Sequence, residues 1–123
     1  MSRIAQFAVA ALFLAAASGC VSGGSACDDL SDRVEITVTA DGMVPSQPAV
    51  CRDRDVTLAV TPEISGVLHV HGYDEDLPAT TIVEGEPIEL TFRSSRSGQF
   101  PVELHTDADA QGIDVGIFTV HEP

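Results

Sequence analysis

The chain has 123 residues, of which 19 are acidic and six are basic, so its formal net charge at pH 7 is −13. This length allows one domain at most. The charge excludes nucleic acid as a partner, argues against binding to anionic lipid surfaces, and favours cationic ligands. Most of the carboxylates are expected to be ordinary solvated surface groups.

The N-terminal twenty residues have the pattern of a secretory signal peptide. Arg3 is a lone cationic residue, an apolar stretch follows over Phe7–Ala17, and small residues close it at Ser18–Cys20. The apolar stretch is too short to serve as a permanent membrane span. The segment Leu14–Cys20 resembles a bacterial lipobox, in which the cysteine is acylated and becomes the mature N-terminus.

This resemblance predicts the domain organisation. We expect a lipoprotein signal peptide over residues 1–19, lipidation at Cys20, a flexible tether over 20–32 and a folded domain over 33–123. Ala17 stands where the usual lipobox has leucine, so an ordinary secretory signal without lipidation is the alternative. The Gly- and Ser-rich residues directly after Cys20 favour the lipid-anchored form.

The three cysteines fit the same organisation. Lipidation of Cys20 leaves Cys27 and Cys51, an even pair in an oxidising compartment. We expect these two to form a disulfide that pins the N-terminal segment to the domain. Closing a loop of this length is worth about 3 kcal/mol in the chain-entropy model.

Beyond the tether, short runs of alternating apolar and polar residues follow one another with turn residues between them, and no helical period is present. A run that holds two prolines belongs at a sheet edge. Seven or eight short strands predict a small β-sandwich. The expected strands cover residues 34–39, 45–50 (the edge strand), 56–61, 67–73, 80–83, 88–93, 100–105 and 113–121.

The segment Leu68–Pro78 holds two of the four histidines and the only tyrosine. Alternation along a strand puts His69, His71 and Tyr73 on one face. Two imidazoles at this spacing start roughly 6.6 Å apart along the strand, close enough to converge on one ion if the strand bends. Gly72 is where such a bend would cost least.

Over Val34–Glu122 the order and spacing of these segments resemble the cupredoxins, the Greek-key copper proteins that include plastocyanin and azurin. His69–Asp76 is laid out like the plastocyanin segment in which the first copper histidine precedes an aromatic residue and an acidic turn. Gly98–Leu104 is similar to the strand that leads to the copper cysteine, and Gly112–Val120 to the segment with the copper methionine and the closing strand. The resemblance implies an all-β Greek-key sandwich.

The ligand positions implied by the resemblance are mostly changed. Leu104 stands at the cysteine position, Asp107 at the second histidine and Ile113 at the methionine, so that only His69 is kept. A blue-copper centre needs a thiolate, and electron transfer by such a centre is therefore excluded. The chain looks more like the divergent cupredoxin-like domains of bacterial envelope proteins, among them those of iron- and copper-handling lipoproteins.

In the cupredoxin arrangement, the strand with His69 and the strand ending at His105 lie side by side at the loop-rich end of the sandwich. We expect this to gather His69, His71 and His105, with Glu103 on the same face as His105. Imidazoles with a carboxylate suit copper, and zinc is possible. In the alternative interpretation these histidines are structural, bonded to backbone and to Glu103 in the space that a lost copper centre left.

An enzyme is not expected. The sequence contains no nucleophile elbow, Gly-rich phosphate loop or Cys-x-x-Cys pair. His-Val-His also occurs in copper–zinc superoxide dismutase, but that site needs further histidines for its bridged zinc, and only two remain here. Asp74–Asp76 beside a proline is typical of a turn rather than of a calcium site.

The sequence therefore predicts an extracytoplasmic lipoprotein, anchored to the bilayer through its acylated N-terminus, in the periplasm or on the outer face of the cell envelope. It is expected to bind copper or hand it on through histidines. The alternative is a metal-free module of the same fold that acts through contacts with an envelope protein.

Overall fold

The computed structural model describes residues 24–123 and shows an all-β domain of nine strands in two sheets. The expected signal peptide (1–19), Cys20 and the first tether residues lie outside the described residues. The strands are β1 (Arg33–Thr39), β2 (Gly42–Val44), β3 (Ala49–Cys51), β4 (Asp55–Pro62), β5 (Gly66–Val70), β6 (Thr80–Ile82), β7 (Ile88–Arg93), β8 (Gly98–His105) and β9 (Ile113–His121).

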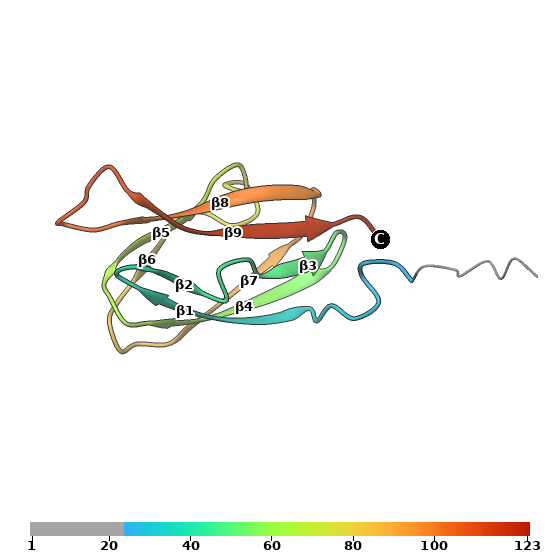
Figure 1. The fold of residues 1–123 in the computed structure, drawn as a ribbon, viewed down its shortest axis with the longest axis horizontal. Helices are drawn as coiled ribbons and strands as arrows, with labels where there is room; N and C mark the ends of the chain where they lie inside the picture. Colours follow the sequence, from blue (N-terminus) through green and yellow to red (C-terminus); the bar gives the residue numbers. More distant parts are fainter. Residues whose placement is uncertain (1–23) are drawn as a thin grey trace, which may run out of the picture.

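The strands form a Greek-key sandwich, as the sequence predicted (Figure 1). One sheet has the order β2-β1-β4-β7 and the other β3-β9-β8-β5-β6. The pairs β1–β4 and β3–β9 run parallel, and the others run antiparallel. The alternation did not predict β2, which folds back on β1 after the turn at Asp41 and pairs Val38 with Met43.

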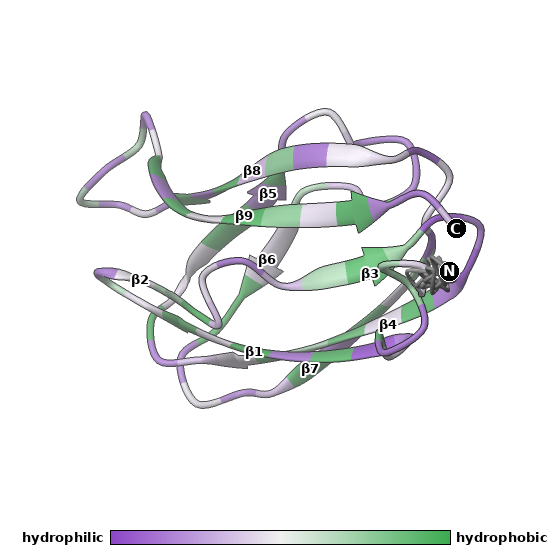
Figure 2. Ribbon diagram, turned by 45° about the vertical axis from the view of Figure 1, so that its right-hand side comes forward, coloured by the Kyte–Doolittle hydropathy of each residue, from purple (hydrophilic) through white to green (hydrophobic). Residues whose placement is uncertain are grey.

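The core lies between the two sheets and is built from the alternating apolar residues of nearly every strand. Strand β1, for example, turns Ile36 and Val38 inward and leaves polar residues outside, an alternation that Figure 2 shows. The largest fully buried side chains are Tyr73, Phe118, Ile82 and Leu104. The prolines of the 45–50 run precede β3, which lies at a sheet edge as expected.

The pairing of β5 with β8 positions the histidines. The two strands are antiparallel neighbours, with Leu68 opposite Leu104 and His69 opposite Glu103. Leu68 and Leu104 are buried between the sheets, so the alternation turns His69 and Glu103 to the outer face of the five-stranded sheet. A polar row therefore crosses the outside of the sheet, directly over the leucines of the core.

The first described residues of the chain are held against the end of the sandwich that lies opposite the β8–β9 loop. A disulfide joins Cys27 to Cys51, with 5.5 Å between their Cα atoms. In Figure 1 the first described residues and the C-terminus lie at one end of the sandwich and the β8–β9 loop at the other. Part of the predicted tether is thus fixed to the domain. Within residues 24–123, no helix has the length and apolar character needed to cross a membrane.

The contribution of the disulfide to the free energy of unfolding should be measurable. Removing it in a Cys27→Ser/Cys51→Ser variant is expected to lower the free energy of unfolding by about 3 kcal/mol, because the unfolded chain is no longer cross-linked. Denaturant unfolding of oxidised wild type and variant would measure the difference. Thiol labelling of the denatured, non-reduced protein should leave both cysteines unmodified, and labelling of both would refute the bridge.

Candidate metal site

Three residues on the outer face of β5 and β8 form a possible metal-binding group. His69, Glu103 and His105 each present a ligand atom, and these atoms all lie within 4.8 Å of one another. All three side chains are partly buried, at 21%, 23% and 32% exposure, so the group is neither enclosed nor freely solvated. The elements that carry the group are two central strands of the sheet, which are rigid supports.

His71 approaches the same group from just beyond the end of β5. Its Nε2 lies 2.6 Å from Glu103 Oε2, while His105 Nε2 lies 3.2 Å from the same oxygen. Its ring centre is 4.5 Å from that of His69. The structure thus places all four predicted residues together, with the Glu103 carboxylate between two imidazoles, although His71 stands outside the set of three.

The hydrogen bonds of His105 involve both of its ring nitrogens. Its Nδ1 lies 3.1 Å from the backbone oxygen of Ala110. Its Nε2 lies 3.2 Å from Glu103 Oε2. Both oxygens only accept, so each contact is a hydrogen bond when the facing nitrogen carries a proton, and a metal ion can take the place of the proton on Nε2.

Asp74 is a member of the site that the sequence did not reveal. Its carboxylate contacts His69 Nε2 in an ion pair across the turn that follows β5. If this nitrogen donates to the carboxylate, the neutral His69 ring has its free lone pair at Nδ1. The acidic run at residues 74–76 had indicated only a turn. His69 and Asp74 are five positions apart in the sequence, and no strand periodicity links them.

Tyr73 lies in the turn that directs Asp74 toward His69. The predicted position of Tyr73 was wrong. Alternation predicted that it shares a face with His69 and His71, but its side chain is fully buried in the core. The strand ends at Val70, and Gly72 adopts a φ of +78°, which reverses the alternation. The Tyr73 hydroxyl donates to the backbone oxygen of Arg96 over 3.0 Å.

The neighbouring histidines lower the pKa values of the Glu103 and Asp74 carboxylates. The hydrogen bond from His71 lowers the pKa of Glu103 below its ordinary value, and His105 adds a smaller effect. The hydrogen bond from His69 lowers the pKa of Asp74 in the same way. Across β9, Asp114 is the register partner of Glu103, so a second acid lies beside the group. The site is a cluster of acids and imidazoles with no lysine or arginine among them.

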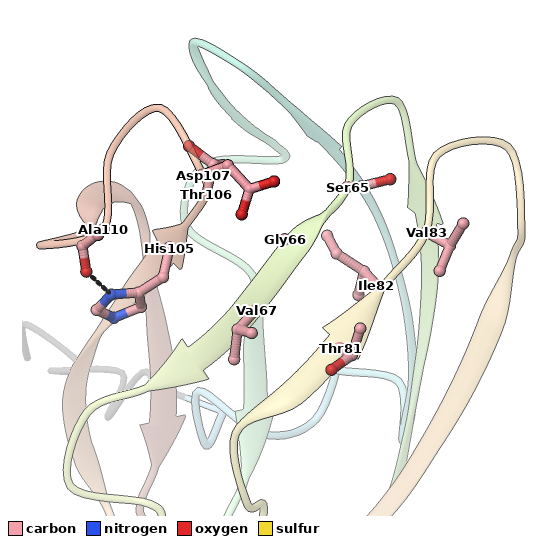
Figure 3. A pocket seen from close by; sticks show the side chains of 10 residues that line it. All are labelled: Ser65, Gly66, Val67, Thr81, Ile82, Val83, His105, Thr106, Asp107 and Ala110. Atoms are coloured by element: carbon pink, nitrogen blue, oxygen red, sulfur yellow. Dashed lines mark hydrogen bonds between the residues drawn. The ribbon is translucent and has the colours of Figure 1, made fainter.

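A hollow of about 450 Å³ opens beside His105 (Figure 3). Its walls come from the start of β5, from β6 and from the loop after β8. Val67 and Val83 line it, and these are two of the three large apolar side chains that are exposed within residues 24–123. Of the residues in the metal group, His105 alone is part of its lining.

At the level of sequence, no family model and no curated protein matches the chain. Solved structures match its fold. Reduced auracyanin from the photosynthetic bacterium Roseiflexus castenholzii superposes with a TM-score of 0.57 at 17% identity, over 74% of this chain and 98% of that one. The fold is that of a cupredoxin.

Two further structures support this assignment at similar TM-scores. A copper binding protein, solved by NMR in its apo form, matches at 0.58 with 10% identity, over 72% of this chain and 86% of that one. A chain of a heme-copper terminal oxidase matches at 0.57 with 13% identity, over 72% of this chain and 64% of that one. At these identities the likeness concerns the fold alone.

The cupredoxin-like domain does not offer the interior site that its fold family implies. Leu104, at the position of the copper cysteine, is fully buried in the apolar core, and Asp107 is exposed on the following loop. Without a thiolate these residues do not fit a blue-copper centre. The histidines had been expected at the loop-rich end of the sandwich. The group they form extends instead along the outer face of β5 and β8, because alternation turns His69 away from Leu104.

Mutation can distinguish the effect of His71 on the pKa of Glu103 from the effect of His69 on the pKa of Asp74. His71→Ala should raise the pKa of Glu103 toward its ordinary value and leave Asp74 nearly unchanged, because it removes the hydrogen bond that stabilises the ionised carboxylate. His69→Ala should raise the pKa of Asp74 instead. Carboxyl carbon shifts followed by NMR over a pH titration would measure both values. Ordinary pKa values for both acids in the wild type would contradict these contacts.

Proposed function

We propose that this chain is an extracytoplasmic, membrane-tethered cupredoxin-like lipoprotein that binds a copper ion, or hands it on, through its histidines. The supporting observation is the set of ligand atoms from His69, Glu103 and His105 within 4.8 Å of one another. Imidazole nitrogens and a carboxylate oxygen are suitable donors for Cu(II) and for Zn(II). Within this proposal His71 supports the site by holding the Glu103 carboxylate.

The charge of the cluster favours a bound cation. His105 Nε2 lies 3.2 Å from Glu103 Oε2, and Asp114 lies opposite the same glutamate on β9. Like charges directly opposite one another on neighbouring strands destabilise a sheet. A divalent ion held between the imidazoles and Glu103 would offset this repulsion. The surplus of acids over the whole chain would also attract cations toward the domain.

Copper is favoured over zinc on two grounds. Sites with nitrogen and oxygen donors generally bind Cu²⁺ more tightly than Zn²⁺. One of the structural neighbours is named as a copper binding protein, which is in keeping with a copper ligand for this fold. With no thiolate among the donors, the proposed centre is not of the blue-copper kind.

The tether would set how the domain faces the membrane. An anchor at Cys20 would precede Gly24 by four residues, a reach of about 14 Å for extended chain. The described N-terminal segment lies at the end of the sandwich opposite the β8–β9 loop. The loop beside His105, and with it the hollow, would then be directed away from the bilayer.

Copper titration tests the site directly. Cu(II) should bind the wild type with one ion per chain and give a pale, tetragonal electron paramagnetic resonance spectrum, since no thiolate can produce the intense blue band. His69→Ala and His105→Ala should each weaken binding by more than about 100-fold, because each removes a ligand, and His71→Ala by about 10-fold. Binding should weaken below about pH 6.5, because imidazole ligands must be neutral.

His121→Ala is the matched control for this titration. His121 ends β9 and pairs with Cys51 on β3, away from the β5–β8 face, so its removal should leave the affinity unchanged. Stoichiometric binding that survives the loss of both His69 and His105 would place the ion elsewhere. A wild type that binds neither Cu(II), Cu(I) nor Zn(II) would favour the metal-free module.

The anchor is tested by fractionation. The wild type should sediment with membranes and enter the detergent phase, because acyl chains partition into the bilayer. Cys20→Ser should either release the protein into the soluble fraction or leave it unprocessed. Recovery of the wild type wholly in the soluble fraction would refute lipidation.

A further inference from the structure

The orientation of the His105 ring depends on the loop that joins β8 to β9. The ring lies beneath residues 106–112, and its Nδ1 bonds to the backbone oxygen of Ala110 at 3.1 Å (Figure 3). The Nε2 atom at the other end of the ring lies 3.2 Å from Glu103 Oε2. The ring is therefore held between two acceptors, and Nε2 is the nitrogen that faces the other residues of the metal group.

Gly112 leaves the space that this ring occupies. A Cβ at this position would lie 2.7 Å from Cε1 of His105 and 3.0 Å from each of its ring nitrogens. Its three nearest neighbours would all be atoms of that one ring. The residue also has a φ of +87°, a conformation that side chains disfavour. Any side chain here would push the imidazole away from Ala110 or from Glu103.

The loop has its own hydrogen bonds, which hold the Ala110 carbonyl in place. The backbone N–H of Thr106 donates to Asp109 over 3.1 Å, and that of Asp109 donates back to Thr106 over the same distance. The Asp109 N–H also lies 3.0 Å from Thr106 Oγ1. The Gly112 N–H donates to the Asp109 oxygen at 3.2 Å. Within this hydrogen-bonded turn, the backbone oxygen of Ala110 contacts the His105 ring.

We propose that Gly112 is a positioning residue of the metal site. By leaving room for the His105 ring against the Ala110 carbonyl, it holds Nε2 of that ring beside Glu103. This inference rests on the metal binding of the proposed function but not on its lipid anchor. Hydrogen bonds to the second nitrogen of a ligating histidine commonly change metal affinity by about 10- to 100-fold.

The first test needs no metal. The His105 ring shifts in ¹H–¹⁵N spectra of the metal-free protein should change in Gly112→Ala, because the added Cβ would displace the ring. Unchanged His105 shifts would overturn the inference even if copper binds. Changed shifts in a protein that binds no metal would uphold the positioning by Gly112 and refute the metal site alone.

The second test compares two glycines with nearly equal backbone conformations. Gly112→Ala should lower copper affinity by about 10- to 100-fold and change the His105 ring shifts. Gly85→Ala is the matched control, because Gly85 has a φ of +77° and a Cβ there would meet nothing within 4 Å. It introduces the same backbone strain without touching a ring, so its affinity should equal that of the wild type.

A double variant separates positioning from general damage. If Gly112 acts through His105, adding Gly112→Ala to His105→Ala should weaken the remaining copper binding no further. Amide NMR spectra of each variant would establish that the fold is kept. Equal affinities of Gly112→Ala and Gly85→Ala, or a full additional loss in the double variant, would overturn the proposal. If Gly112→Ala does not fold, adding His105→Ala should restore the fold, because it removes the ring that the new Cβ would meet, and a double variant that stays unfolded would overturn the proposal.

Discussion

The register of β5 against β8 is the constraint on which the site depends. Leu68 faces Leu104 inside the sandwich, and this places His69 opposite Glu103 outside it. A slip by one residue would expose both leucines, and each buried leucine contributes about 1.5–3 kcal/mol. The partly exposed contacts between histidines and carboxylates in the site are worth about 0–1 kcal/mol each, as surface ion pairs are. The core therefore sets the register, and the histidine cluster follows from it.

The cluster brings acids and imidazoles into direct contact. Glu103 lies between the Nε2 atoms of His71 and His105, while Asp114 stands opposite it on the next strand. Hydrogen bonds from the histidines keep the pKa values of Glu103 and Asp74 low, so that both carboxylates are ionised at neutral pH. An arrangement of this kind is suited to hold a cation between its members.

This domain has a cupredoxin fold but lacks the thiolate ligand of the copper site for which that fold is known. The sandwich has a packed apolar interior, and Leu104, which the resemblance places at the thiolate ligand, is buried in it. The polar residues that could hold an ion lie on the outer face of the five-stranded sheet, where acids and histidines of β5 and β8 meet. A fold alone does not determine function, and the residues of the site must be considered separately.

The sequence by itself determined the sandwich, its inward-facing rows and the pairing of Cys27 with Cys51, because strand alternation and cysteine parity are local or countable properties. It also named His69, His71, Glu103 and His105, since histidines stand out in a chain that has only four.

Only the tertiary structure decided how these residues meet. The burial of Tyr73, the return of Asp74 to His69, and the space that Gly112 leaves for His105 depend on where turns redirect the chain. Turn geometry reverses the alternation from which the faces were predicted. Contacts between residues on different strands are fixed by packing of the whole core, which no local pattern encodes.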